Sequence, residues 1–316
     1  MKTNGNYLAI DGGTTNTRLA LIQNGSVTAV RKIGVGARMN RENPDLLTSE
    51  LRAAILAILS ENGLAETDVC CILASGMITS EFGLCPLPHL TAPVGLAELH
   101  DGMHPTALPA ISPIPFVFLR GVKIDSQSFA EVDMMRGEET ELMGLATNAG
   151  ASAVYVLPGS HSKIVELDSE GRITTFSTML SGEMIYALSQ HTILCDAVDL
   201  SLRTTDENYL LRGYDFAHEA GISRALFKAR ILKNLFRATP AEVYSYFLGV
   251  VLAPEIDSIL ASEAQTVIIG GKSEIKSAMA TLLRHRSDKH IQTLSDEAVD
   301  RSVFLGALRI FTFNED

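Results

Sequence analysis

A short polar segment near the N-terminus combines residue types that bind phosphate and a divalent cation. An apolar run over residues 7–10 is typical of a buried strand, and Asp11, two glycines and a cluster of hydroxyl and amide side chains follow it. Adjacent glycines let the backbone approach a ligand closely, and successive N–H groups there can form an anion-binding nest. Asp11 is suited to hold Mg²⁺ through water, because Mg²⁺ keeps several of its own waters. The residues expected to contact the phosphates are Gly12, Gly13, Thr14, Thr15, Asn16 and Arg18.

The elements around this segment indicate a hairpin. Residues 19–23 are typical of a return strand, Asn24-Gly25 is a strong two-residue hairpin signal, and residues 27–32 follow as a third strand. A dinucleotide-binding G-x-G-x-x-G segment would lead directly into a helix, whereas a strand follows here. The segment is therefore predicted to be a hairpin phosphate loop, and an ordinary β-turn rich in small polar residues is the alternative.

The same succession of elements recurs in the second half of the chain. A strand, a glycine turn rich in hydroxyls, a return strand, a second turn and a third strand occupy residues 154–176. Gly13 and Gly159 are 146 positions apart, and Gly25 and Gly171 have the same separation. An internal duplication explains the equal spacing. The residues of the second turn expected to contact phosphate are Gly159, Ser160, His161, Ser162 and Lys163.

Length and charge limit the classes of protein. At roughly 150 residues per domain, the 316 residues predict two domains, 1–149 and 150–316, with a helical insertion at about 200–238 in the second. The chain has 26 basic and 37 acidic residues, a net charge of −11. A protein that reads a phosphate backbone carries a basic patch, so nucleic acid is not expected as a partner. Local donors must therefore hold any anionic ligand.

The cysteines and the apolar segments favour a cytoplasmic protein. The four cysteines show no metal-binding spacing, and reduced thiols are typical of the cytosol. No charged and apolar leader opens the chain. No stretch approaches the roughly 18 apolar residues of a membrane helix, so no membrane contact is expected.

Two further strand ends offer loops that suit a ligand. Residues 70–74 are typical of a buried strand, and ligands bind at the carboxyl ends of strands in open α/β sheets. In the loop that follows, the residues expected to contact substrate are Gly76, Met77 and Ser80. Residues 266–269 predict another strand, and its end, Gly270 and Gly271, suits a flat base or ribose lying on the backbone. An ordinary strand-to-helix turn is the alternative at both places.

Two adjacent carboxylates begin a helix between the duplicated halves. Glu138 and Glu139 follow Arg136 and Gly137 and precede an apolar-faced helix. Carboxylates at this position stabilise the positive end of the helix dipole, which is the structural explanation. Because the helix connects the two halves, its N-terminus is expected to face the cleft between them. A carboxylate there can act as a general base toward a substrate hydroxyl, and Arg136 can bind a substrate carboxylate through its fork of donors.

The chain resembles the actin, Hsp70 and hexokinase superfold, in which two hairpin-containing halves are joined by a helix. Within that superfold it resembles the 2-dehydro-3-deoxygalactonokinase family. The segments that carry the resemblance span nearly the whole chain: Asp11–Arg18, Ser75–Ser80, Met135–Thr140, Leu157–Lys163, Ser181–Glu183 and Gly270-Gly271. The resemblance implies an α/β fold of two duplicated ribonuclease-H-like (actin-like ATPase) domains, with ATP bound in a cleft between them.

The resemblance also implies an activity. Such a protein is an ATP-dependent carbohydrate kinase that phosphorylates the terminal 6-hydroxyl of 2-dehydro-3-deoxy-D-galactonate in galactonate catabolism, with ATP and Mg²⁺ as cofactors. In the more distant glycerol kinase type, an aspartate at the corresponding helix start is the base. By that analogy Glu138 is expected to be the base, and Glu139 is the second candidate. His161 and Lys163 are expected to support the transferred charge, with a structural role as the alternative for His161.

Three positions depart from the family pattern. Gly12 and Ile164 stand where the family usually has tryptophan, and Ser160 stands where it has threonine. The serine keeps the hydroxyl, whereas the missing tryptophans bear on the exact substrate. The alternatives are a kinase of another sugar or sugar acid on the same fold, or a non-catalytic nucleotide-dependent switch. A small-molecule sugar acid is the expected partner, and the sequence is compatible with a homo-oligomer.

Overall fold

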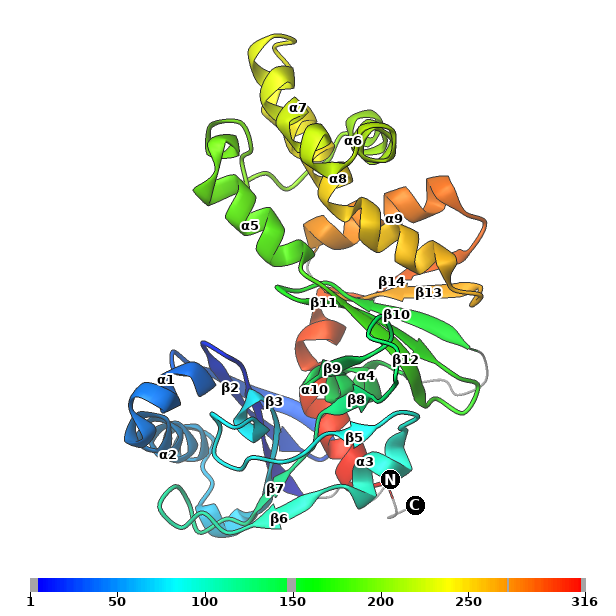
Figure 1. Ribbon diagram of the computed structural model, residues 1–316. Helices are drawn as coiled ribbons and strands as arrows, with labels where there is room; N and C mark the ends of the chain where they lie inside the picture. Colours follow the sequence, from blue (N-terminus) through cyan, green and yellow to red (C-terminus); the bar gives the residue numbers. More distant parts are fainter. Residues whose placement is uncertain (1–4, 147–151, 272, 314–316) are drawn as a thin grey trace. The chain divides into compact units, whose positions relative to one another are not determined.

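The computed structural model describes residues 5–146, 152–271 and 273–313. The chain forms two compact units (Figure 1). The first comprises Met1–Ala151, Asp168–Thr175 and Glu297–Asp316, and the second comprises Ser152–Leu167 and Phe176–Asp296. This division differs from the expected domains, 1–149 and 150–316, chiefly in the last helix. That helix belongs with the first unit, where its Phe304 ring lies 5.3 Å from the guanidinium carbon of Arg18.

A six-stranded sheet of the first unit has the strand order β3-β2-β1-β4-β7-β6. Its strands are β1 (Asn6–Gly12), β2 (Thr17–Gln23), β3 (Ser26–Ile33), β4 (Val69–Gly76), β6 (His104–Thr106) and β7 (Phe116–Phe118). The pairs β1–β2 and β2–β3 are antiparallel, so the first predicted hairpin is confirmed. Strand β4 runs parallel to both β1 and β7. The carboxyl ends of these three strands therefore lie along one edge of the sheet.

The core of the first unit lies between this sheet and a long helix. The helix α2 (Pro44–Glu61) buries Leu47, Leu51 and Ile55 in the same cluster as Leu8 and Leu19 of the sheet. Burial of each such side chain contributes about 1.5–3 kcal/mol. The other elements of the unit are α1 (Ala37–Glu42), α3 (Leu96–Asp101), α4 (Glu138–Leu145), α10 (Asp296–Phe311), the 3₁₀ turns η1 (Glu66–Asp68) and η2 (Met77–Thr79), and a small sheet of β5 (Leu90–Thr91), β8 (Val122–Ile124) and β9 (Asp133–Met135).

The second unit repeats the hairpin and sheet. Its strand order is β12-β11-β10-β13-β14, with β10 (Ala153–Leu157), β11 (Ser162–Leu167), β12 (Ile173–Met179), β13 (Thr266–Ile269) and β14 (His290–Thr293). Strands β10 and β11 are antiparallel, as the second predicted hairpin requires. Strand β13 runs parallel to β10 and β14, so the carboxyl ends of β10 and β13 share one edge.

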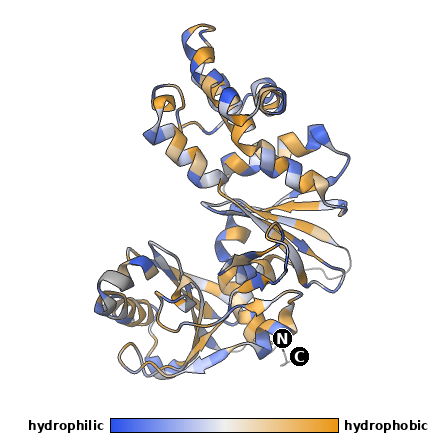
Figure 2. Ribbon diagram, viewed as in Figure 1, coloured by the Kyte–Doolittle hydropathy of each residue, from blue (hydrophilic) through white to orange (hydrophobic). Residues whose placement is uncertain are grey.

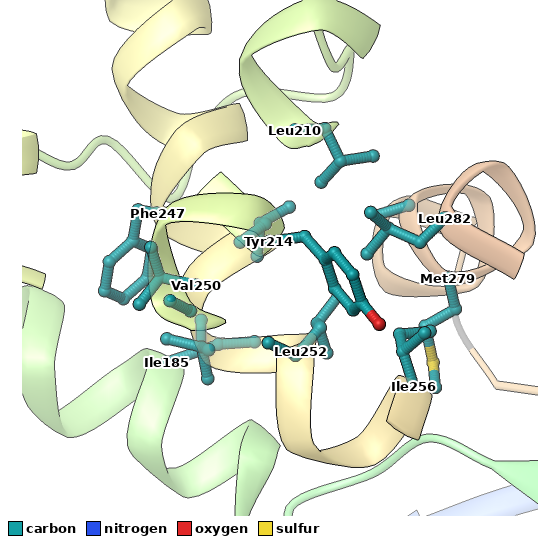
Figure 3. Packing of buried hydrophobic residues seen from close by; sticks show 14 of the residues in the cluster. Ile185, Leu210, Tyr214, Phe247, Val250, Leu252, Ile256, Met279 and Leu282 are labelled. Carbon is teal, nitrogen blue, oxygen red and sulfur yellow. The ribbon is translucent and has the colours of Figure 1, made fainter. Parts of the chain in front are cut away.

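Helices pack around one apolar helix in this unit. They are α5 (Ser181–His191), α6 (Glu207–Ala220), α7 (Ile222–Asn234), α8 (Pro240–Ala261) and α9 (Ser273–Arg286), with the 3₁₀ turn η3 (Ile193–Asp196). Figure 3 shows Phe247 and Ile256 of α8 in one cluster with Ile185, Leu210 and Leu282 of other helices. Hydrophobic and hydrophilic residues alternate along α6 and α7 (Figure 2), which is typical of helices with one buried face.

The length and composition of α8 depart from the sequence-based expectation. Of the described helices, only α8 is long and apolar enough to cross a membrane, whereas no such segment is expected from the sequence. In the structure, 78% of the 18-residue apolar stretch of α8 is buried inside the protein. A capping box in which the N–H group of Glu242 donates to Oγ1 of Thr239 (3.3 Å) begins the helix. Its burial identifies α8 as the central core helix of the second unit.

Candidate active site

The first hairpin turn is held from behind by α1. The Gly13 N–H group donates to the Asn16 carbonyl (2.9 Å), which closes the turn. The N–H group of Ala37, the first residue of α1, donates to the Gly13 carbonyl (3.0 Å). The side chains of Thr14 and Thr15 are exposed. Their hydroxyls can therefore donate to a phosphate while the backbone of the turn stays fixed.

The second hairpin turn is held in the same way by α5. The Glu183 N–H group, in the first turn of α5, donates to the Ser160 carbonyl (3.1 Å). Ser160 and His161 are exposed, and Nε2 of His161 lies 3.1 Å from Oε1 of Glu183. Ser162 and Lys163, which also belong to the predicted phosphate site, are buried at the start of β11. The exposed part of this turn is therefore shorter than the sequence predicts.

A glycine lies against each turn at the start of the supporting helix. A Cβ atom at Gly36 would lie 2.6 Å from the Gly13 carbonyl oxygen, and a Cβ atom at Gly182 would overlap the Gly159 carbonyl oxygen. Gly36 and Gly182 are 146 positions apart, which is also the separation of Gly13 and Gly159. The duplication therefore includes the support of each turn, and both supports need a residue without a side chain.

The late glycine pair lies against the second turn. The Gly270 N–H group donates to the Val156 carbonyl (2.8 Å). A Cβ atom at Gly271 would lie 2.8 Å from the Pro158 carbonyl oxygen. The predicted base-binding glycines are therefore next to the predicted phosphate turn in the same unit, and one nucleotide needs such neighbouring surfaces.

The carboxyl edge of the first sheet brings the end of β1 beside the start of α4. Gly76 at the end of β4 has φ 82°, and Gly137 just before α4 has φ 115°, which side-chain-bearing residues rarely adopt. A Cβ atom at Gly76 would lie 2.6 Å from the Gly12 carbonyl oxygen and 3.3 Å from Oδ1 of Asp11. A Cβ atom at Gly137 would lie 3.3 Å from Cα of Gly76. These glycines let three backbones touch, so Asp11 lies close to the start of α4.

The loop after β4 packs against the first turn. Oγ of Ser80 donates to the Met77 carbonyl (2.7 Å), so this predicted substrate residue is bonded within its own loop. Ile78 is 1% exposed, and a Cβ atom at Gly12 would lie 2.7 Å from Cβ of Ile78. A tryptophan at position 12 would therefore displace Ile78, which accounts for the glycine found there.

Asp11 is paired with an arginine across the hairpin. Asp11 and Arg18 are direct neighbours in the β1–β2 register. Nε and Nη2 of Arg18 donate to Oδ2 of Asp11 at 2.9 and 2.7 Å. Arg18 therefore orients and neutralises Asp11, in addition to its predicted role toward the phosphates. Among the described residues, no group of three or more histidine, cysteine, aspartate or glutamate residues could hold a metal ion.

The two carboxylates at the start of α4 have different surroundings. Oε2 of Glu138 accepts a hydrogen bond from the Arg136 N–H group (3.1 Å), and the residue is partly exposed. Glu139 is wholly buried, and its two oxygens accept from the Gly137 N–H group at 2.9 and 2.8 Å. Burial, followed by the charge of Glu138, raises the pKa of Glu139 to about 8. Glu139 therefore stabilises the turn, whereas Glu138 is the more exposed of the two carboxylates.

The family of the chain follows from a match over most of its length. Residues 11–305 match the model of the 2-keto-3-deoxy-galactonokinases. The chain belongs to this family. 2-Dehydro-3-deoxygalactonokinase of Escherichia coli (strain K12) is 29% identical over 280 residues, which are 84% of this chain and 86% of the relative. Probable 2-dehydro-3-deoxygalactonokinase DgoK1 of Rhizobium meliloti (strain 1021) is 28% identical over 329 residues, 98% of this chain and 99% of the relative.

Solved structures agree with this assignment. A Sinorhizobium meliloti crystal structure described as a 2-dehydro-3-deoxygalactonokinase has 25% identity and a TM-score of 0.78, over 96% of this chain and 98% of that chain. (R)-2-hydroxyglutaryl-CoA dehydratase component A of Acidaminococcus fermentans has 14% identity and a TM-score of 0.54, over 99% and 100% of the two chains, a likeness of fold alone. The predicted family and the predicted α/β fold of duplicated actin-like ATPase halves are confirmed. As a 2-keto-3-deoxy-galactonokinase, the chain is a nucleotide-using carbohydrate kinase.

The Arg136 side chain of this 2-keto-3-deoxy-galactonokinase is bonded to residues 79–89, a segment distant in sequence. Nη1 donates to the carbonyl and Oγ1 of Thr79 at 2.8 and 2.7 Å, and Nη2 donates to the Leu87 carbonyl at 3.1 Å. Nη2 also lies 3.3 Å from Nδ1 of His89. Burial, followed by the charge of Arg136, lowers the pKa of His89 to about 4, so the neutral ring can accept from Nη2. The predicted contact of Arg136 with a substrate carboxylate therefore competes with four protein acceptors.

A third carboxylate of α4, Glu141, is not among the site residues predicted from the sequence. Glu141 lies three residues after Glu138, so both project from the same side of the helix. Burial, followed by the charges of Glu138 and Asp11, raises the pKa of Glu141 to about 8, although Arg18 opposes the shift. The i, i+3 spacing is the sequence signal that identifies it.

The predicted site residues thus form two groups, one in each unit. The first group is Asp11, Gly12, Gly13, Thr14, Thr15, Asn16, Arg18, Gly76, Met77, Ser80, Arg136, Glu138 and Glu139. The second group is Gly159, Ser160, His161, Ser162, Lys163, Gly270 and Gly271. The acidic residues all belong to the first group, and the second contains hydroxyls, an imidazole and a lysine.

Proposed function

We propose that this protein transfers the γ-phosphoryl group of ATP to the terminal 6-hydroxyl of 2-dehydro-3-deoxy-D-galactonate, a step of galactonate catabolism. The family match and the names of both relatives support this substrate. The observation that carries the mechanism is the position of Glu138, a partly exposed carboxylate at the N-terminus of α4, near the strand end that bears Asp11.

Glu138 is the proposed general base. It takes the proton of the 6-hydroxyl while that oxygen forms a bond to the γ-phosphorus. The bond between the γ-phosphorus and its bridging oxygen breaks, and ADP leaves with those electrons. Transfer of this kind depends mainly on positioning and on stabilisation of charge. Glu139 is unsuited to this role because it is wholly buried, bonded to the Gly137 N–H group and protonated up to about pH 8.

The nucleotide contacts are assigned to the two hairpin turns and the late glycine pair. Exposed hydroxyls and turn amides would bind the β- and γ-phosphates: Thr14, Thr15, Gly12, Gly13, Gly159 and Ser160. Gly270 and Gly271 would lie under the adenosine. With a net charge of −11, the chain must hold the phosphates through such local donors. The contact of His161 with Glu183 keeps the imidazole beside this turn.

Asp11 fits a water-mediated Mg²⁺ ion. Its Oδ1 lies toward Gly76, whereas its Oδ2 accepts from Arg18. Because the described residues contain no cluster able to bind a metal directly, the remaining ligands would be water and phosphate oxygens. Mg²⁺ bound there would neutralise charge on the phosphates.

Binding the substrate carboxylate requires a cationic side chain whose donors are not all bonded to other protein groups. Arg120 follows β7, whose Phe118 pairs with Ala74 of β4, so it lies at the same sheet edge as Gly76. Its Nε is buried and has no hydrogen-bond partner among the described residues. The guanidinium of Arg136 instead donates to Thr79 and Leu87. We therefore assign the carboxylate contact to Arg120, and the shaping of the Met77–Ser80 loop to Arg136.

Acceptor-dependent consumption of ATP tests the proposed function. The panel is 2-dehydro-3-deoxygalactonate, its gluconate epimer, galactonate, galactose and a sample without acceptor, all with Mg²⁺. Turnover on the galactonate derivative alone is expected. Turnover on another member would keep the kinase and replace the substrate. ATP hydrolysis that no acceptor changes would favour a nucleotide-dependent switch and overturn the proposal.

A further inference from the structure

A buried carboxylate lies beneath the second hairpin turn. Glu255 of α8 is 1% exposed. Its Oε1 accepts a hydrogen bond from the hydroxyl of Ser162, and its Oε2 accepts one from the hydroxyl of Ser181. Ser162 is the first residue of β11, and Ser181 is the first residue of α5. One side chain therefore joins the return strand of the hairpin to the helix that supports the turn.

Burying the Glu255 carboxylate in a core helix costs free energy. Burial of a carboxylate is unfavourable unless its oxygens are hydrogen-bonded. Here burial raises the pKa of Glu255, and the two serine hydroxyls lower it. Fourteen of the 22 residues of α8 are buried, and the neighbours of Glu255 along the helix are mainly apolar. Simple filling of the core would be better served by an apolar side chain, so the two hydrogen bonds point to a specific role.

The residues that follow Ser181 explain what the carboxylate fixes. Gly182 lies against the Gly159 carbonyl, and the Glu183 N–H group donates to the Ser160 carbonyl (3.1 Å). A shift of the start of α5 would therefore move the turn itself. Because Ser162 and Ser181 share the same carboxylate, Glu255 sets the separation between the two sides that hold the turn.

We propose that Glu255 is a positioning residue for nucleotide binding. By holding the starts of β11 and α5 together, it keeps the amide groups and the Ser160 hydroxyl of the second turn in the arrangement that binds phosphate. This inference rests on the proposed function only in that the turn binds a nucleotide. Glu255 itself is buried, so its effect on the ligand would be exerted through the turn.

The test compares Glu255→Gln with wild type by calorimetric titration with ADP, which needs no sugar acid. Glutamine keeps the volume but loses the charge-assisted hydrogen bonds. A fall in ADP affinity of about tenfold is expected, which is less than the roughly 10²-fold cost of misplacing reacting groups by about 1 Å. In steady state, the KM for ATP should rise while the KM for the sugar acid stays unchanged. Ser162→Ala and Ser181→Ala should each lower the ADP affinity by a smaller factor. These two variants replace Glu255→Gln in the test if that variant does not fold.

The matched control is Ser245→Ala on the same helix. The Ser245 hydroxyl is buried, accepts from the Asp206 N–H group (2.7 Å) and lies away from the hairpin in sequence and contacts. It should lower the denaturation midpoint without changing ADP affinity. Equal ADP affinity in wild type, Glu255→Gln and both serine variants would overturn the inference. Normal ADP binding by wild type without phosphorylation of any acceptor would instead overturn the proposed function and leave the inference standing.

Discussion

In both hairpins, a side chain at the start of the return strand is joined to the segment that supports the turn, but the side chains differ. In the first unit, the hydroxyl of Thr17 at the start of β2 donates directly to the Val35 carbonyl (2.8 Å), next to Gly36. In the second unit, Ser162 at the start of β11 is joined to Ser181, next to Gly182, through Glu255. Val35 and Ser181 are separated by the same 146 positions as the glycines. The glycine contacts of the two halves thus correspond in position. The hydrogen bonds that join the return strand to the supporting segment differ, because only the second unit uses a carboxylate.

The strand ends before the turns differ even more. Asp11 ends the first strand, and Leu157, 146 positions later, is a buried apolar residue. Near Asp11 lie Arg18 and the carboxylates of α4, whereas the second turn has hydroxyls and the imidazole of His161. In the proposed function, the proton and metal chemistry therefore belongs to the first unit, and the second unit binds phosphate without a carboxylate ligand.

The largest effect is expected at the start of α4. Glu138→Gln removes the proposed base and should lower kcat by about 10²–10⁴-fold. Glu139→Gln should lower it less than tenfold, because Glu139 is buried and already holds a proton at neutral pH. Steady-state kinetics of both variants, with ADP affinity as the control for folding, measure the difference. A larger loss in Glu139→Gln than in Glu138→Gln would exchange the two roles.

The next effect concerns the strand end. Asp11→Asn should lower activity or raise the Mg²⁺ concentration needed for half-maximal rate by about 10–100-fold, as expected for a residue that orients metal-bound water. Leu157→Met, at the corresponding place in the second unit, should leave the Mg²⁺ dependence unchanged. Titration of the rate with Mg²⁺ checks both. An unchanged Mg²⁺ dependence in Asp11→Asn would contradict the proposal that Asp11 orients Mg²⁺.

The duplicated glycines predict a smaller and paired effect. Gly36→Ala and Gly182→Ala each place a methyl group against a turn carbonyl, and overpacking of this kind costs about 1–3 kcal/mol. Gly182→Ala should be the worse of the two because its Cβ would lie closer to the carbonyl oxygen. Denaturant unfolding measures the free energy, and ADP titration measures the affinity. Wild-type behaviour in either variant would show that the corresponding turn tolerates displacement.

The buried carboxylates of α4 predict a pH dependence of stability. In the unfolded chain, Glu139 loses its proton near its ordinary pKa of 4.5, whereas in the folded protein it keeps the proton up to about pH 8. Between these values the folded state binds more protons, so the free energy of unfolding falls as pH rises. Glu139→Gln should make the free energy of unfolding fall less steeply with pH. The remaining pH dependence is expected from Glu141. Chemical denaturation at pH 5, 6.5 and 8 tests it, and an identical slope in the variant would contradict the assigned pKa.

The sequence predicts both hairpins and their glycine turns because the signals are local: strand runs, an Asn-Gly turn and a repeated spacing. It does not predict Glu255, because 93 positions separate it from Ser162 and it stands as one acid in an apolar helix. The acceptors of Arg136 come from residues 47 to 57 positions away and depend on tertiary packing. The sequence also does not show which unit the last helix packs against, because that depends on contacts with residues distant in the chain.

Phosphorus NMR of the product shows which hydroxyl of the sugar acid receives the phosphate. Wild-type enzyme, Mg²⁺-ATP and 2-dehydro-3-deoxygalactonate should give a new phosphomonoester signal split into a triplet, because a phosphate on the terminal carbon couples to its two protons. The signal should be absent with Glu138→Gln under the same conditions. A doublet would place the phosphate on a secondary hydroxyl, and inorganic phosphate alone would mean hydrolysis; either result would contradict a kinase of the terminal hydroxyl.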